Sequence, residues 1–448
     1  MPFLKHDRIT PAQVVILGFL FQILIGACLL SLPVATQSGE RVPFLDALFT
    51  ATSATCVTGL VIHDTALFWS PFGQGVILLL IQVGGMGVVT MAVAIFMFSG
   101  RKIGLKQRWV MQESISAPQV GGIVRMTGFI LKTAFLIEAI GALLLALRFC
   151  PQFGLGKGIW YGIFHAVSAF CNAGFDLMGE TGAFSSLTGY VGDPLVNLVI
   201  CLLIVVGGLG FLTWHDVAAH GRHVSQYRLQ SKLILLTTLA LLVGGFLFFR
   251  FYEFSRPQWA ALTGGERGLA ALFQSVSPRT AGFNTVDLTQ LSACSQLMTI
   301  LLMLAGGSPG STAGGFKTTT LAVLLLSVGA VIRRQGSARC FGRRLPDQVL
   351  RNACAIFLLY LVLFLAGGML ICCMDEIPLM QALFEAASAI GTVGLSLGAT
   401  AEASEVSRLI LIFLMYFGRV GGLTMIYAMA AGSNGASSQY PQEQVTVG

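Results

Sequence analysis

A short glycine-containing segment recurs four times along the chain at nearly even spacing. Each copy ends in a glycine that is followed by Leu or Phe, and these glycines are Gly59, Gly174, Gly282 and Gly394. The steps between them are 115, 108 and 112 residues. Each copy follows a short apolar run and precedes a long one. An internal repeat decides the fold, because every copy is one structural unit that packs against its neighbours.

The composition places this repeat in a membrane. Of the 448 residues, 55% are hydrophobic and only 10% are charged, whereas average soluble proteins carry about 25% charged residues. A helix needs about 20 apolar residues to cross the hydrocarbon core. Runs of this length occur at 14–35, 75–98, 124–149, 194–217, 231–252, 296–330, 351–374 and 407–430. We therefore predict an all-α polytopic membrane protein.

A shorter apolar segment lies between the members of each pair of long runs. These segments are 42–54, 158–170, 267–277 and 377–389. At 11–13 residues they are too short to span, which favours helices that enter and leave on one side. The predicted unit is helix, short pore helix, Gly loop and helix, repeated around a pseudo-fourfold central pore. The predicted units are 1–100, 101–218, 219–335 and 336–448.

The distribution of charge predicts the orientation. The N-terminus and the links 101–132, 218–232 and 330–351 hold 17 of the 27 Lys and Arg residues. The positive-inside rule therefore places the links and both termini in the cytoplasm, and the net charge needs no nucleic-acid partner. The other side carries most of the acids, as a rim that would concentrate cations. These acids are Asp64, Asp176, Glu180, Asp193, Glu253, Asp287, Asp375, Glu376, Glu402 and Glu405.

The four glycine segments are the strongest candidates for a functional site. Irregular backbone at membrane depth is tolerated only where it is buried in protein or lines an aqueous path. One such glycine would be an ordinary turn, but four equivalent segments can form rings of carbonyl oxygens that replace a cation's hydration shell. The candidate residues are Thr55, Cys56, Val57, Thr58, Gly59, Cys171, Asn172, Ala173, Gly174, Thr280, Ala281, Gly282, Gly391, Thr392, Val393 and Gly394.

Glycine clusters also recur in the second long run of each unit, 24 to 33 residues after the loop glycine. Paired glycines are unfavourable in a helix interior, so they predict close packing or a hinge. The third unit goes further, since 304–320 contains five glycines and Pro309 and must interrupt its helix. This segment differs from a phosphate-binding loop because Phe316 separates Gly315 from Lys317.

The segments 54–60 and 277–284 resemble the pore loops of the Trk/Ktr/HKT superfamily of cation transporters. The four-unit layout matches along nearly the whole chain, and the start of the chain at the first unit and the ending 440–448 resemble a Ktr-type membrane subunit. The resemblance implies a K⁺-conducting homodimer in the cytoplasmic (inner) membrane. It also implies a partner, a ring of cytoplasmic regulatory subunits that bind nucleotide. No cofactor is expected in this chain.

The resemblance further implies a gate beneath the filter, formed by the intramembrane loop of the third unit and an arginine of the last helix. The implied gate residues are Gly306, Gly307, Ser308, Pro309, Gly310, Ser311, Thr312, Ala313, Gly314, Gly315, Lys317 and Arg419. One departure from the repeat is visible. Phe273 lies 9 residues before Gly282, whereas Phe49, Phe164 and Phe384 lie 10 residues before their glycines. The third pore helix is therefore predicted to be shifted in register.

Three questions stay open at the level of sequence. Transport is either passive or coupled to Na⁺ as a symport, and a Na⁺-permeable or weakly selective channel is an alternative within the superfamily. A secondary transporter with a midplane site is the alternative from another class. The apolar run 124–149, which is predicted to span, also contains Glu138, whose partner is unknown. No constellation of residues suggests an enzyme, and the ten cysteines are interpreted as reduced.

Overall fold

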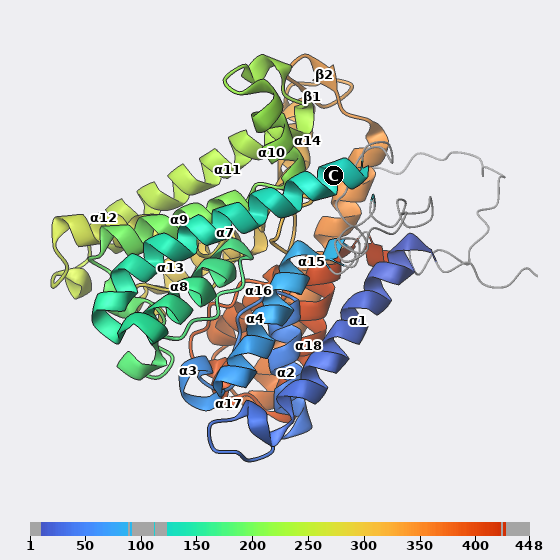
Figure 1. Ribbon diagram of the computed structural model, residues 1–448. Helices are drawn as coiled ribbons and strands as arrows, with labels where there is room; N and C mark the ends of the chain where they lie inside the picture. Colours follow the sequence, from blue (N-terminus) through green and yellow to red (C-terminus); the bar gives the residue numbers. More distant parts are fainter. Residues whose placement is uncertain (1–9, 88–89, 92–111, 113–122, 423, 427–448) are drawn as a thin grey trace, which may run out of the picture.

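The computed structural model describes residues 10–87, 90–91, 112, 123–422 and 424–426 (Figure 1). The ending 440–448, the first residues of the chain and most of the basic link 101–132 lie outside the described residues. The described part is α-helical, apart from one hairpin of β1 (Arg339–Cys340) and β2 (Arg343–Arg344). The predicted all-α membrane fold is confirmed.

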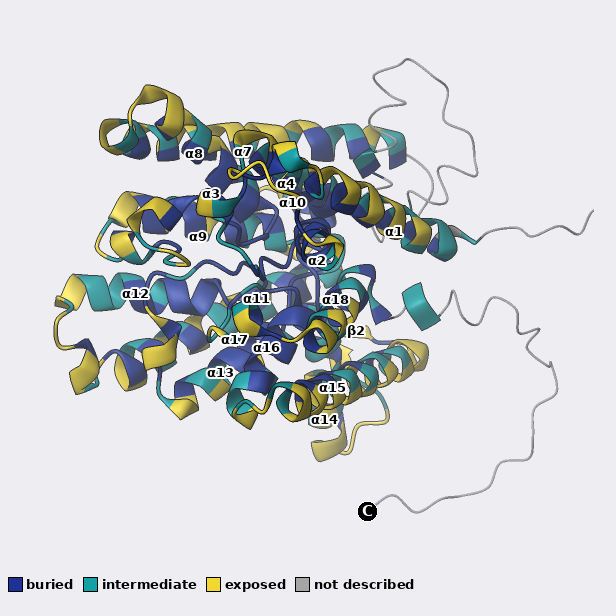
Figure 2. Ribbon diagram, turned by 90° about the horizontal axis from the view of Figure 1, so that it is seen from below, coloured by how far each residue is buried: buried dark blue, intermediate teal, exposed yellow. Residues whose placement is uncertain are grey.

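The first helix of each predicted unit is long and lies on the outside of the molecule. These helices are α1 (Pro11–Leu30), α7 (Ile123–Phe153), α11 (Leu229–Phe248) and α15 (Asp347–Asp375). Together with a π-helical turn at Phe249–Glu253 after α11, they are the described helices that are long and apolar enough to cross a membrane unbroken. Buried residues gather in the middle, and exposed residues cover the outward sides of helices such as α1 and α15 (Figure 2).

A short helix packs inside each of these long helices. The short helices are α2 (Phe44–Thr55), α8 (Leu155–Phe170), α12 (Gly264–Val276) and α16 (Leu379–Gly391). Their bounds lie within three residues of the predicted segments. Smaller helical turns follow them in the chain, among them α3 (Thr65–Phe68), 3₁₀ turns at Met178–Thr181, Thr188–Tyr190 and Leu288–Gln290, and α17 (Ala399–Glu402).

The second long helix of every predicted unit is interrupted. The break predicted in the third unit is present, and the other three runs, predicted to span unbroken, are interrupted as well. These elements are α4 (Pro71–Met86), α9 (Pro194–Gly208) with α10 (Phe211–His220), α13 (Ala293–Leu304) with α14 (Thr318–Ile332), and α18 (Glu405–Val420). The α9–α10 pair is bent by 97°. Gly87, Gly210 and Gly421 have φ of 87°, 89° and 89°, a conformation that ends a helix and that glycine adopts without strain.

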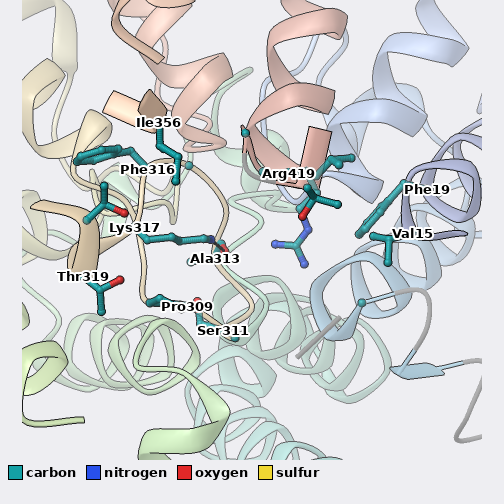
Figure 3. Close-up of a pocket in the computed structure, with 18 of the residues that line it drawn as sticks. Val15, Phe19, Pro309, Ser311, Ala313, Phe316, Lys317, Thr319, Ile356 and Arg419 are labelled. Atoms are coloured by element: carbon teal, nitrogen blue, oxygen red, sulfur yellow. Dashed lines mark hydrogen bonds between the residues drawn. The ribbon is translucent and has the colours of Figure 1, made fainter. Parts of the chain in front are cut away.

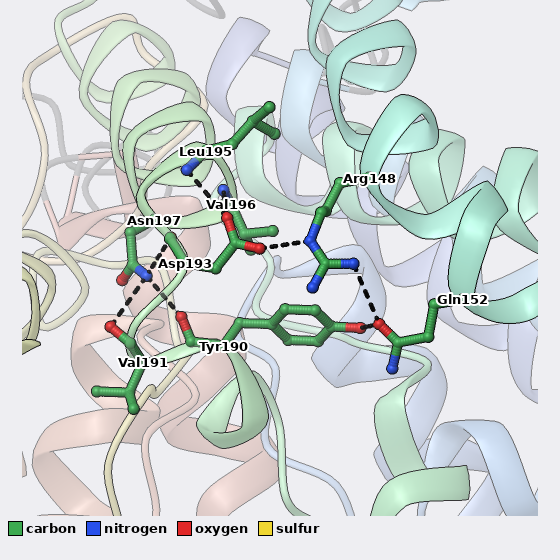
Figure 4. A network of polar contacts seen from close by, with 8 residues as sticks. All are labelled: Arg148, Gln152, Tyr190, Val191, Asp193, Leu195, Val196 and Asn197. Atoms are coloured by element: carbon green, nitrogen blue, oxygen red, sulfur yellow. Dashed lines mark hydrogen bonds and ion pairs between the residues drawn. The ribbon is translucent and has the colours of Figure 1, made fainter.

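Polar side chains tie the two long helices of the second unit together at one end (Figure 4). Asp193 caps α9 by accepting from the backbone of Leu195 and Val196 at 3.0 and 3.1 Å, and its other carboxylate oxygen accepts from Arg148 of α7 at 2.5 Å. The carboxylate of Asp193 therefore holds helices in place instead of facing a pathway. Glu253 is similar, since it is buried and accepts from Ser292 and Ser295 at 2.6 Å each.

Candidate functional site

The four loop glycines lie in a closed ring, here called the Gly ring. Gly59, Gly174, Gly282 and Gly394 have φ of 88°, 69°, 85° and 97°. A Cβ on Gly174 would lie 2.6 Å from the carbonyl oxygen of Ala281, the residue before the next glycine. The same overlap joins Gly59 to Ala173, Gly282 to Val393, and Gly394 to Thr58. A side chain at any of the four positions is excluded by both backbone conformation and space.

The chain builds each loop by the same local geometry. The residue two positions before each ring glycine is left-handed, with φ of 52°, 58°, 73° and 51° at Val57, Asn172, Thr280 and Thr392. In three loops the next backbone N–H reaches a carbonyl five residues back, as in Thr58 to Ser53 at 2.8 Å. This bond lets the short helix end while the following carbonyl stays at the ring.

The third loop closes with one residue fewer. The N–H of Ala281 bonds to the carbonyl of Ser277, only four residues back, at 2.9 Å. The shift indicated by the spacing of Phe273 is therefore taken up between the helix end and Thr280, before the ring is reached. Gly282 keeps the same contacts as the other ring glycines.

A buried serine at the end of each short helix fastens the loop, and sequence reasoning missed these residues. Ser53 and Ser388 accept from the N–H of Gly59 and Gly394 at 3.0 Å each. Ser168 donates to the carbonyl of Phe175 at 2.7 Å, and Ser277 donates to that of Phe283. The signal was present as a serine five or six residues before each glycine.

The residues one turn before the ring are less alike. The position three before the glycine holds Cys56, Cys171, Arg279 and Gly391 in the four loops. Arg279 is buried and its guanidinium lies 3.5 Å from the hydroxyl of Thr238 on α11. The side-chain amide of Asn172 lies 3.1 Å from the hydroxyl of Thr280 and so connects the second and third loops.

A cavity of about 400 Å³, here called the acidic cavity, opens on one side of the Gly ring. All four ring glycines line it, together with four of the predicted acids, Asp64, Asp176, Asp287 and Glu402. Of the others, Asp193 and Glu253 make the structural contacts described above. Burial alone would raise the pKa of Asp287, but hydrogen bonds from Thr289 and Gln290 bring that pKa below its ordinary value. Asp287 is therefore ionised at neutral pH.

The predicted break of the third unit lies at 305–317, on the other side of the ring, and this loop caps helices of its neighbours. Thr312 and Ser308 donate their N–H groups to the carbonyls of Gly207 and Gly208 at the end of α9, at 3.3 and 3.0 Å. Gly315 donates to the carbonyl of Gly418 near the end of α18 at 3.1 Å. These bonds satisfy carbonyls that an interrupted helix leaves without partners.

Arg419 caps the remaining interrupted helix. It donates to the carbonyls of Gly84 and Gly85 at the end of α4, the latter at 2.9 Å, and to the carbonyl of Thr312 in the loop. Its guanidinium points between the loop at Ala313 and the ring of Phe19, 5.8 Å away (Figure 3). The sequence placed Arg419 inside a long span, but it lies in the last turn of α18, where a cation is favoured by the helix dipole.

Arg419 and Lys317 line a second cavity of about 520 Å³, here called the Arg419 cavity. Lys317 donates to the carbonyls of Ala313 and Gly314 at 2.9 and 3.2 Å, so it braces the loop from within. Among the described residues that line this cavity, none is acidic. The acidic and Arg419 cavities thus lie on the two sides of the Gly ring and differ in the sign of their charge.

Recurring glycines bring the interrupted helices against the short helices. A Cβ on Gly84, Gly207 or Gly418 would overlap the carbonyl oxygen of the residue four before the ring glycine, which is Thr55, Phe170 or Ile390. The expected close packing is therefore present in these three units. In the third unit a Cβ on Gly306 would meet the loop's own carbonyls at Gly314 and Phe316, at 2.8 and 2.9 Å.

Glu138 contacts the region behind the second loop. Its carboxylate accepts from the amide of Gln82 on α4 at 3.1 and 3.2 Å, and the thiol of Cys171 lies 3.9 Å away. Glu138 is buried, and these contacts are all to neutral groups. It therefore joins α7, α4 and the loop of the second unit and does not line either cavity.

Comparisons with known proteins agree with this architecture. The TrkH family model, described as a cation transport protein, matches residues 21–440. The potassium/sodium uptake protein NtpJ of Enterococcus hirae and the Ktr system potassium uptake protein B of Bacillus subtilis are each 40% identical, over 99% of this chain and 98% of theirs. The crystal structure of the potassium transporter TrkH from Vibrio parahaemolyticus has a TM-score of 0.72 at 19% identity, covering 95% of this chain and 86% of that one.

Proposed function

The chain belongs to the family of cation transport proteins, and on this premise we propose that it is the ion-conducting membrane subunit of a K⁺ uptake system. The observation that carries the proposal is the closed Gly ring. K⁺ enters the acidic cavity, where the carboxylates raise its local concentration. It then sheds water and is coordinated by backbone carbonyls of the four loops. The names of the relatives support the choice of K⁺.

The 305–317 loop and Arg419 form the gate in this proposal. A cation leaving the ring meets the guanidinium of Arg419, whose positive charge repels it. Because the loop bonds to α9 and α18 and Arg419 bonds to α4, a force on any of these helices can move the barrier. A ring of cytoplasmic nucleotide-binding subunits supplies this force, and the membrane subunit acts as a homodimer in the cytoplasmic membrane. The acidic cavity faces outward.

The proposal is tested by K⁺ uptake in cells that cannot otherwise accumulate K⁺. We compare the wild type with Gly59→Ser and Gly282→Ser, because a side chain at either glycine overlaps a neighbouring loop. Gly154→Ser is the control, since Gly154 has a similar φ of 82° but no atom near a Cβ. The two ring variants are expected to change K⁺ affinity or K⁺/Na⁺ preference. If neither does, the ring is not the filter.

A Na⁺-permeable or Na⁺-coupled transporter is the second candidate, favoured by the potassium/sodium name of the relative NtpJ. The residues before the ring glycine differ among the loops, so carbonyl sites beside the ring are unequal. Competition of Rb⁺ uptake by K⁺ and by Na⁺ separates the candidates. Strong competition by K⁺ alone supports a K⁺ filter, and equal competition supports weak selectivity.

A further inference from the structure

A groove of about 430 Å³ lies between α11, α14 and α15. It shares no lining residue with the acidic cavity but adjoins the Arg419 cavity, since Pro309, Thr319, Thr320 and Ile356 line both. Leu229, Leu233, Val323 and Val349 give it apolar walls. Its lining also includes Pro309, which belongs to the 305–317 loop, and Thr319 and Thr320 just after it. Within the described part of the chain, the groove is an open, mostly apolar channel that reaches the loop.

A basic hairpin adjoins this groove. Arg339, Arg343 and Arg344 are exposed on β1 and β2, and the turn between the strands carries an exposed Phe341. Leu345, which follows β2, lines the groove and donates its N–H to the carbonyl of Ala338 at 3.0 Å. The hairpin is thus continuous with the groove wall. Figure 1 shows it at the opposite end of the molecule from α3 and α17.

Several positively charged side chains lie at the hairpin, and few acidic side chains pair with them. The ammonium of Lys232, on α11 between groove residues Leu229 and Leu233, lies 5.8 Å from the centre of the Phe341 ring. Lys232 also donates to the carbonyl of Ser225 at 2.7 Å. Arg344 lies 3.5 Å from Asp347, with both side chains exposed. Among the described residues, no ion pair joins Arg339 or Arg343 to an acid. A net positive rim therefore borders an apolar groove.

We propose that this rim and groove bind an anionic phospholipid. The headgroup phosphate is held by Arg343 and Arg344 with Lys232, since guanidinium and ammonium groups match phosphate. One acyl chain lies in the groove, and the aromatic ring of Phe341 enters the headgroup region. Basic pockets between spanning helices on the cytoplasmic side are suited to such lipids. This partner fits better than an acidic protein surface, because a charged surface alone would leave the apolar groove unfilled.

The bound acyl chain would touch the loop that caps α9 and α18. Pro309 of the loop lines both the groove and the Arg419 cavity. An occupied groove therefore restrains the segment that we propose as the gate. Loss of the lipid frees one face of that segment, so flux should respond to the anionic lipid content of the membrane.

The test measures lipid retention, which does not depend on transport. The purified full chain is exchanged into nanodiscs of phosphatidylglycerol and phosphatidylcholine, and retained lipid is counted by native mass spectrometry. The wild type is expected to retain phosphatidylglycerol about tenfold over phosphatidylcholine. The double variant Arg343→Gln/Arg344→Gln should lose this preference. The control Arg250→Gln/Arg256→Gln removes the same charge near the far end of α11 and should keep it.

A second variant tests the groove separately from the charge. Val349→Trp fills the groove from an exposed position, so it should lower retention of both lipids and leave the fold intact. Equal retention of the two lipids by the wild type would overturn the proposal. The proposal would also be overturned if Arg343→Gln/Arg344→Gln kept the preference for phosphatidylglycerol. If that variant in addition no longer bound a cytoplasmic regulatory subunit, the hairpin would be a protein-docking surface.

Discussion

The layer of the Gly ring and the layer beneath it follow opposite rules. At the ring, four different sequences adopt one backbone geometry, with the same left-handed residue and the same contact to the next loop. Beneath it, a glycine with a positive φ of 87° or 89° lies at the interruption in three units, and only the third unit supplies the 305–317 loop. In the proposed function, ion coordination needs equivalent loops around an axis, whereas a barrier across that axis needs only one element. The two layers are therefore expected to fail differently when altered.

The largest effect is expected at the ring itself. In Gly394→Ala the new Cβ overlaps the carbonyl oxygen of Thr58. The alanine must also adopt the φ of 97° that Gly394 has. K⁺ uptake should fall by about a hundredfold, equivalent to roughly 2.7 kcal/mol. Gly154→Ala, with positive φ and open space, should transport normally. Comparable losses in both variants would mean that backbone strain, and not ring geometry, limits transport.

The next effect tests whether the two layers are coupled. A Cβ on Gly207 would overlap the carbonyl of Phe170 and lie 2.9 Å from the hydroxyl of Thr312, while one on Gly208 would have its nearest neighbour at 3.5 Å. Gly207→Ala should cost about 2 kcal/mol of stability through overpacking, seen as a lower Tm in detergent. Gly208→Ala should be tolerated. If the two variants have the same Tm, the close packing of α9 on the second loop does not contribute to stability.

A smaller effect of opposite sign is expected below the ring. Arg419→Gln removes the guanidinium that joins α4 to the loop, and its positive charge leaves the Arg419 cavity. K⁺ flux into liposomes should rise by about tenfold as the electrostatic barrier weakens. Arg351→Gln, an exposed residue of α15, is the control. If K⁺ flux through Arg419→Gln is unchanged, Arg419 is not part of the gate.

The smallest effect is expected at the rim. Asp287→Asn removes one carboxylate from the acidic cavity, and uptake at low K⁺ and low ionic strength should fall about twofold. Since hydrogen bonds hold the pKa of Asp287 below its ordinary value, the charge of Asp287 itself is constant between pH 6 and 8. Burial raises the pKa of Asp176 in the same cavity to about 7, so the two proteins are best compared at pH 8, where both carboxyl groups of the wild type are mostly ionised. Added salt should abolish the difference in uptake. A difference that persists in high salt would indicate a structural defect instead.

The membrane fold and the short helices could be predicted because hydropathy and spacing act over many residues. The glycine clusters of α4, α9 and α18 indicated close packing or a hinge, but not a full interruption, because glycines such as Gly87 and Gly210 lie in long apolar runs. The capping of helix ends by the loop was also invisible, because those hydrogen bonds join backbone groups far apart in the chain. The serines such as Ser53 and Ser388 recur in all four loops, but serine is common near helix ends, so their spacing alone does not indicate the hydrogen bonds that they make to the loops.

The single 305–317 loop has a consequence for how such a chain can evolve. It donates hydrogen bonds to the helix ends of both flanking units. If all four units carried such a loop, each loop would have to cap helix ends in units that contain a loop of their own. A symmetric tetramer of one short subunit could form the ring, but its four loops would compete for the same space on the axis. Fusion into one polypeptide lets the copies diverge. Once one copy carries the loop and its neighbours bind it, the units can no longer exchange places in the chain.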